Sequence, residues 1–189
     1  SVNVYCCFDN EEVGSNTKQG AMSTFLKDVL HRINNGLHKT EEEYYQAIAK
    51  TFLVSCDNAH ALHPNHPEKT DAVNYVTMNG GIVIKESANQ KYTTDAFSRA
   101  LFTGVCQNVN VPVQSFANRS DSVGGSTLGN LSNTQVSIHA VDFGLAQLAM
   151  HSCFETAGVK DTEYAIIALK EFYETNVQID EAESVCLEK

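Results

Sequence analysis

Acidic and imidazole side chains follow three apolar runs of this sequence. The adjacent Glu11 and Glu12 follow the first run, Asp57 follows the second, and His151 comes shortly after a third. In an open α/β sheet the carboxyl ends of parallel strands gather at one edge, which is where such folds bind ligands. Carboxylates and imidazoles together suit Zn²⁺, Mn²⁺ or Co²⁺. The pattern therefore predicts a divalent-metal site at that edge.

Two adjacent glutamates at the end of an apolar run need not share one task. One can ligate a metal ion while its neighbour accepts a proton from an activated water as general base. The alternative is that Glu11 and Glu12 are two solvated turn carboxylates, because most glutamates are exposed. Asp57 could likewise cap the turn that follows it, and His151 could be a buried, hydrogen-bonded histidine. Spacing alone leaves these alternatives open.

A separate group of three histidines lies beside two prolines. His60, His63 and His66 form an H-x2-H-x2-H pattern, which suggests a separate zinc site. Such a site usually has four ligands, and the pattern offers three. Pro64 and Pro67 also prevent the histidines from sharing the face of a helix. We therefore do not expect a separate zinc site there.

Strand-like and helix-like segments alternate along the chain, which predicts the α/β class with a mixed, mostly parallel central sheet flanked by helices. The capping box of Thr40 and Glu43 marks the start of one helix. We expect the stretch over 146–157 to start a loop or a helix, and the acidic tail after Asp180 to be a frayed terminus. Strands are expected over 2–8, 51–56, 80–86, 111–117 and 136–143, and helices over 20–37, from 40 onward, over 94–108 and over 161–174.

Composition excludes several classes of protein. The 189 residues carry a formal net charge of −10, which argues against nucleic acid or an anionic membrane as partner. No apolar run approaches the ~20 residues that span a bilayer, and no signal peptide is visible. The six cysteines form no CxxC pair and mostly lie in apolar runs, which indicates free thiols in a reducing compartment. We therefore expect a cytoplasmic protein.

Five sequence blocks occur in an order that closely resembles the aspartyl aminopeptidase family of dinuclear zinc exopeptidases. The resemblance extends from Val4 to about Phe172. A lone E-E-V-G would be weak evidence, because the related glutamyl aminopeptidase and endoglucanase-like family also carries one. The blocks are FDNEEVGSNTKQGA, SCDNAHALHPN, NQKYTTDAFSRAL, NRSDSVGGSTLG and VDFGLAQLAMHS.

The resemblance implies a zinc exopeptidase-like fold and a metal-dependent aminopeptidase that removes an N-terminal, acidic residue from peptides. It makes Glu11 the general base, Glu12 a ligand of one metal, and Asp57 and His151 ligands of the other. The two divalent ions would be zinc, with manganese or cobalt as alternatives. On the substrate side it suggests His60, the cations Lys91 and Arg119, and the backbone N–H groups around Gly125.

The same family needs two more metal ligands, an Asp and the His of an H-x-D motif, upstream of the glutamate pair. Its members also carry an inserted domain that builds a large tetrahedral homo-oligomer. The resemblance therefore implies that residues 1–189 are the C-terminal part of a metallopeptidase catalytic domain. It also implies that the upstream ligands and the oligomerisation insert are absent here, so that this chain alone is inactive.

A second interpretation belongs to another functional class. The chain could be a non-catalytic fragment or scaffold that retains the fold without a complete metal site. An H-x-D motif and a further Asp upstream of Ser1 in the parent gene would favour the enzyme. A start codon near Ser1 would favour the scaffold.

Overall fold

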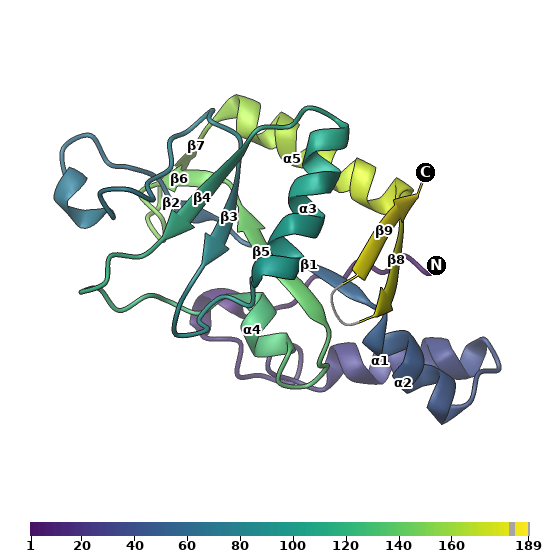
Figure 1. The fold of residues 1–189 in the computed structure, drawn as a ribbon. Coiled ribbons are helices and arrows are strands. Elements are labelled where there is room, and N and C mark those ends of the chain that lie inside the picture. The colour runs from purple at the N-terminus through teal and green to yellow at the C-terminus, as the bar shows by residue number, and fades with distance from the viewer. Residues whose placement is uncertain (182–183, 189) are drawn as a thin grey trace.

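The computed structural model describes residues 1–181 and 184–188 and contains a central four-stranded sheet (Figure 1). Its strand order is β1-β5-β3-β4. β1 runs parallel to β5 and β3 runs parallel to β4, whereas β3 and β5 are antiparallel. The expected mixed, mostly parallel sheet is therefore confirmed. The strands are β1 (Phe52–Cys56), β3 (Ile82–Glu86), β4 (Val113–Ala117) and β5 (His139–Gly144).

Side chains of β3 alternate between the two faces of this sheet. Ile82 and Ile84 belong to the main core, where they pack with the helices α3 (Ala96–Asn108) and α5 (Val159–Glu174). Val83 faces the other way and belongs to a second, smaller core cluster. Because side chains two positions apart share a face, Lys85 lies on the Val83 side, away from the helices.

The remaining helices lie at the margins of the sheet. The short α4 (Leu128–Ser132) contacts β1 and β5, while α1 (Phe25–Gly36) and α2 (Glu41–Ala49) project from one end of the molecule (Figure 1). α2 begins as expected at the capping box, in which Thr40 and Glu43 bond each other's backbone N–H groups. No helix within the described ranges is long and apolar enough to cross a membrane.

The N-terminal apolar run is not a strand, contrary to expectation. No residue from 2 to 8 is buried, and none is assigned to regular structure. An apolar, β-branched run predicts a strand only where a neighbouring strand supplies hydrogen-bond partners. No described strand pairs with this run, so it forms no ladder.

Two further segments form strands that the sequence did not predict. The stretch after β5 forms β6 (Ala146–Leu148), which pairs with β2 (Ala59–His60) and β7 (Thr156–Ala157). The acidic tail pairs as the hairpin β8 (Asn176–Glu181) and β9 (Ser184–Glu188), apart from residues outside the described ranges.

The hairpin forms because apolar residues alternate with mostly polar ones along both strands. Val177, Val185 and Leu187 pack against the main core, and Ile179 is buried. A period of two is the pattern of a strand with one buried face. Burial of the apolar face stabilises the hairpin despite the charges on its other face. The acidic composition of the tail predicted a frayed end because composition does not show this alternation.

Candidate functional site

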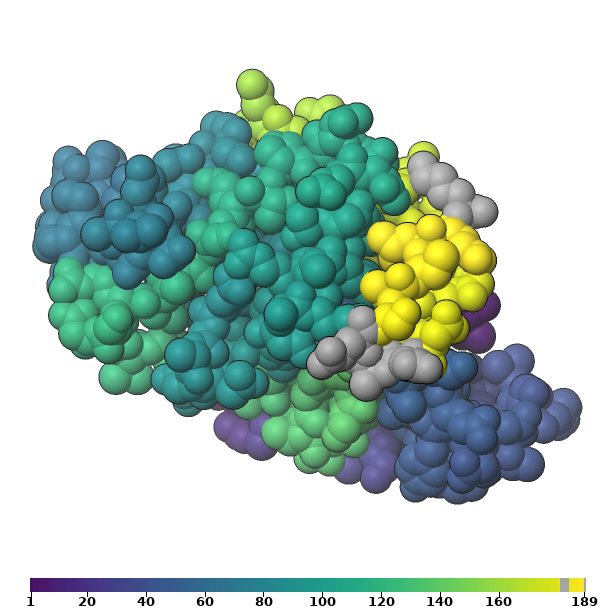
Figure 2. Space-filling model, viewed as in Figure 1, coloured from purple at the N-terminus to yellow at the C-terminus, as the bar shows by residue number. Residues whose placement is uncertain are grey.

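A cavity of about 630 Å³ opens where β1 and β5 end and β2 and β6 begin. Two loops project beside it, over residues 61–75 and 118–126, and Figure 2 shows them together at the left of the molecule. Seven of the eight residues that the sequence nominated line this cavity: Glu11, Glu12, Asp57, His60, Arg119, Gly125 and His151. Lys91 does not line it.

The close approach of the ends of β1 and β5, which are neighbouring parallel strands, places Asp57 at the cavity. The backbone N–H of Asp57 donates to the carbonyl of Phe143 at 2.9 Å. A Cβ on Gly144 would lie 1.8 Å from the Asp57 carbonyl oxygen, so only glycine permits this approach. The Asp57 side chain is half-buried and points toward Lys85, with its Oδ2 3.6 Å from Nζ.

Glu12 and His151 meet at the mouth of the cavity. His151 Nδ1 lies 2.6 Å from Glu12 Oε2, and the two side chains are 64% and 72% exposed. Glu12 lies in the short 3-10 helix Glu11–Val13, and His151 has a left-handed φ of 66° in the turn after β6. Hydrogen bonding to Glu12 and its charge raise the pKa of His151. His151 is therefore not the buried histidine that its apolar neighbourhood suggested.

Glu11 differs from its neighbour in environment. Its side chain is half-buried, and burial raises the pKa of its carboxyl, with the negative charges of Asp57 and Glu12 adding to the effect. Opposite shifts come from His151 and Lys85. Both glutamates line the cavity, but Glu11 is half-buried whereas Glu12 is exposed beside His151.

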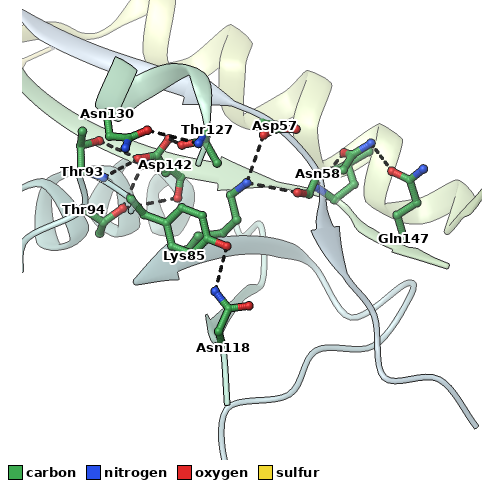
Figure 3. Close-up of polar contacts among 12 residues, drawn as sticks. Asp57, Asn58, Lys85, Thr93, Thr94, Asn118, Thr127, Asn130, Asp142 and Gln147 are labelled. Atoms are coloured by element: carbon green, nitrogen blue, oxygen red, sulfur yellow. Dashed lines mark hydrogen bonds and ion pairs between the residues drawn. The ribbon is translucent and has the colours of Figure 1, made fainter. Parts of the chain in front are cut away.

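Lys85 is a cavity residue that the sequence analysis missed. Its side chain is 2% exposed, and Nζ donates to the carbonyl of Asn58 at 3.1 Å and lies 5.1 Å from the centre of the Tyr92 ring (Figure 3). Burial lowers the pKa of this ammonium group, while Asp57 and Asp142 counteract that shift. The available signal was a lysine on the inward-facing side of the apolar run IVIKE.

Arg119 joins the two projecting loops. Its guanidinium donates to both carboxylate oxygens of Asp121, at 2.9 and 2.7 Å, and to the carbonyl of Glu68. The latter bond attaches the loop that carries His63 and His66 to the loop that carries Gly125. Arg119 therefore lines the cavity with three of its N–H groups bonded to Asp121 and Glu68.

The donor types at the cavity suit zinc, because carboxylates and imidazole are its ordinary ligands. The number of converging donors is smaller than a zinc site requires. Among the described residues, no three His, Cys, Asp or Glu side chains come close enough together to hold a metal ion. Glu12 and His151 form a pair, and Asp57 lies deeper, beside Lys85. By itself the described chain therefore fits part of a metal site.

Comparison with known proteins identifies close relatives. The chain is 49% identical over 173 residues to "Probable M18 family aminopeptidase 2" of Clostridium novyi (strain NT), covering 92% of this chain and 40% of that protein. It is 42% identical over 180 residues to "Aspartyl aminopeptidase 1" of Schizosaccharomyces pombe, covering 95% of this chain and 38% of that protein. The chain thus spans about two fifths of the length of these curated relatives.

Solved structures agree with the sequence relatives. The chain resembles the structure of the yeast mApe1 dodecamer from S. cerevisiae, with a TM-score of 0.75 and 28% identity over 88% of this chain and 36% of that one. The model of the family described as aminopeptidase I zinc metalloprotease (M18) matches residues 1–173. The chain therefore belongs to the M18 family of aminopeptidase I zinc metalloproteases.

Proposed function

We propose that the protein containing this chain is a metal-dependent aminopeptidase, and that residues 1–189 are the C-terminal part of its catalytic domain. One observation carries the proposal: Glu11, Glu12, Asp57 and His151 line the same cavity although they come from distant parts of the sequence. Membership of a family of zinc aminopeptidases supports the reaction class.

Within this proposal Glu12, Asp57 and His151 supply ligands for two zinc ions, with manganese or cobalt as alternatives. When bound, such ions lower the pKa of water toward ~7 and polarise a carbonyl group. The two exposed side chains and the half-buried Asp57 leave a face of the cavity open to further ligands. We infer that the longer protein contributes those ligands.

Glu11 is the proposed general base. Its carboxylate accepts a proton from the attacking water, whose oxygen then bonds to the carbonyl carbon of the N-terminal residue. Glu11 returns this proton to the amine as the C–N bond breaks, which releases the amino acid and the shortened peptide. The half-buried position of Glu11 in the cavity, beside the exposed Glu12, supports this role.

An acidic N-terminal residue is the proposed substrate preference, and Lys85 is the proposed cation that selects it. Lys85 replaces Lys91 in this role because Lys91 does not line the cavity. Arg119 is already held by Asp121 and Glu68. His60 and the backbone around Gly125 remain proposed contacts to the substrate, since both line the cavity. We also propose a homo-oligomer, by analogy with the dodecameric neighbour. The free cysteines support a cytoplasmic location.

The competing proposal is a non-catalytic scaffold. It is favoured by a specific observation, namely that no three potential ligands converge among the described side chains. The two proposals differ in whether the longer protein completes the site.

Glu11→Gln in the longer protein tests the enzymatic proposal. We expect kcat to fall by at least ~10² because general-base catalysis contributes on that scale. Metal content, measured by mass spectrometry, should stay near that of the wild type. Glu12→Gln is the matched control and should lower metal content. Loss of metal from Glu11→Gln with turnover unchanged would exchange the roles of the two glutamates.

Lys85→Met tests the substrate preference separately. The ratio of kcat/KM for Asp-terminated over Leu-terminated peptides should fall at least ~10-fold, since a hydrogen bond to a charged group contributes about 1.5–3 kcal/mol. Lys91→Met is the matched control and should leave the ratio unchanged. An unchanged ratio in Lys85→Met would remove Lys85 from the acidic subsite while leaving the reaction class intact.

A further inference from the structure

A fully buried carboxylate lies behind the cavity and has no place in the proposed chemistry. Asp142 is on β5, directly opposite Ser55 of β1 in the ladder, and is 0% exposed. A buried charge is costly unless hydrogen bonds replace its lost hydration. Its hydrogen-bond partners therefore show what this residue holds in place.

Both carboxylate oxygens of Asp142 accept short hydrogen bonds. Oδ2 accepts from the backbone N–H of Thr93 at 2.6 Å and from its hydroxyl at 2.7 Å. Oδ1 accepts from the hydroxyl of Thr127, also at 2.7 Å. A Cβ on Gly129 would lie 2.6 Å from Oδ1, so α4 also approaches the carboxylate closely. Figure 3 shows Thr93 and Thr127 converging on the one carboxylate.

The two threonines adjoin different segments of the cavity wall: Thr127 lines the cavity itself, and Thr93 follows the lining residue Tyr92. Thr93 directly follows Tyr92, whose ring lies beneath Lys85 Nζ and whose hydroxyl accepts a hydrogen bond from Asn118 at 3.1 Å. Thr127 ends the wall segment Ser122–Thr127, whose earlier residues are mostly exposed. Charge-assisted bonds to a carboxylate are about twice as strong as neutral ones. One buried group thus fixes the spacing of both walls around Lys85.

We propose that Asp142 is a positioning residue, which holds the Tyr92 wall and the Ser122–Thr127 wall at the separation that an acidic N-terminal side chain needs to reach Lys85. This inference rests on the proposed aminopeptidase function for its consequence in catalysis. The positioning itself is a property of the chain alone, so the two can be tested separately.

Hydrogen exchange of the 189-residue chain tests the positioning. Thr127→Val removes the hydroxyl that donates a hydrogen bond to Asp142, whereas Thr127→Ser keeps this hydroxyl. Thr127 N–H donates to Asn130 Oδ1 at 3.2 Å, and Asn133 N–H donates to the Gly129 carbonyl at 3.0 Å. We expect these two hydrogen-bonded amides to exchange about tenfold faster in Thr127→Val, because a buried acceptor that loses a partner costs about 1–3 kcal/mol. In Thr127→Ser the exchange rates of the same amides should stay within about twofold of those in the wild type. Unchanged rates in Thr127→Val would overturn the proposal.

Two further variants control for general loosening of the fold. Thr51→Val removes a hydroxyl that donates to the Ala47 carbonyl, far from the cavity, and should leave exchange at Thr127 and Asn133 unchanged. Thr93→Val retains the backbone bond to Asp142, so it should fold even if Thr127→Val does not. It should speed exchange over 91–94 and not over 46–51. Equal acceleration in both regions would mean that Asp142 supports only global stability and would overturn the proposal.

Peptide selectivity in the longer protein tests the consequence. In Thr127→Val the ratio of kcat/KM for Asp-terminated over Leu-terminated peptides should fall at least about fivefold through a higher KM, and Thr127→Ser should restore it. An unchanged ratio in an active enzyme would overturn the positioning role in selection. If the wild type hydrolyses neither peptide, the proposed function fails, and hydrogen exchange still decides whether Asp142 fixes the two walls.

Discussion

His151 Nδ1 and Glu12 Oε2 lie 2.6 Å apart, although 139 residues separate them in the sequence. Left-handed backbone makes this meeting possible, with φ near 60° at Asn10, just before the glutamate pair, and 66° at His151 itself. Few non-glycine residues adopt this region, and those that do are often at functional sites. The chain therefore brings one carboxylate and one imidazole to a single point at the cavity mouth.

The first prediction concerns zinc binding by the 189-residue chain. Isothermal titration should give a dissociation constant weaker than about 1 µM, because two converging side chains fall short of the three or four protein ligands of a stable zinc site. His151→Ala should weaken it further. Sub-micromolar binding of two ions, together with peptide turnover, would mean that the site is complete within this sequence.

The second prediction concerns acid stability and Glu43. Hydrogen bonds from Lys39 and Thr40 lower the pKa of Glu43 to about 2, from an ordinary value of 4.5. A group whose pKa is lower in the folded chain stabilises it above the unfolded pKa, and this contribution disappears as pH falls through the folded pKa. Glu43→Gln should therefore unfold at a lower temperature than the wild type at neutral pH.

The two proteins should converge as pH falls from 4.5 to about 2, because the wild type loses the contribution that the variant lacks. Thermal unfolding followed by circular dichroism measures this difference. Glu42→Gln, in the first turn of the same helix, controls for the helix dipole. A constant difference across the window would contradict the role of the Glu43 carboxylate.

The third prediction concerns the main core. Phe102 is 0% exposed, and its ring packs against Phe143 with centroids 5.0 Å apart. Phe102→Ala should lower the free energy of unfolding by about 3–5 kcal/mol, through lost burial and the cavity left behind. Phe154→Ala is the matched control, since Phe154 is 82% exposed, and should change it by at most about 0.5 kcal/mol. Urea unfolding compares the two variants.

The fourth prediction concerns cysteine reactivity. All six cysteines are free thiols, as the sequence predicted, but their environments differ. Cys106 is buried on α3, and this burial raises the pKa of its thiol to about 12, whereas Cys7 and Cys153 are exposed. Because the thiolate is the reactive form, N-ethylmaleimide should label Cys7 and Cys153 and leave Cys106 unmodified in the native chain. Mass spectrometry should find six modified cysteines after denaturation, and native labelling of Cys106 would contradict its burial.

Local signals in the sequence determined several helices and strands of this protein. The capping box at Thr40 fixed the start of α2, and the apolar run before Asp57 became β1, because these features depend on neighbours within a few residues. The alternation of such segments predicted the mixed sheet. The ordered blocks around Glu11, Asp57 and His151 indicated the family, and seven of the eight residues nominated from the sequence line the cavity.

Contacts between distant segments decided the rest. Whether the apolar run over 2–8 forms a strand depends on a partner strand, and whether the acidic tail forms a hairpin depends on the core beneath it. Lys85 is a buried cation in the cavity because its face of β3 lies toward Asp57 and Tyr92. Arg119 connects two loops because the Glu68 carbonyl lies within hydrogen-bond distance of its guanidinium. Pairing, burial and hydrogen bonding of this kind are set by neighbours in space, which a linear pattern does not contain.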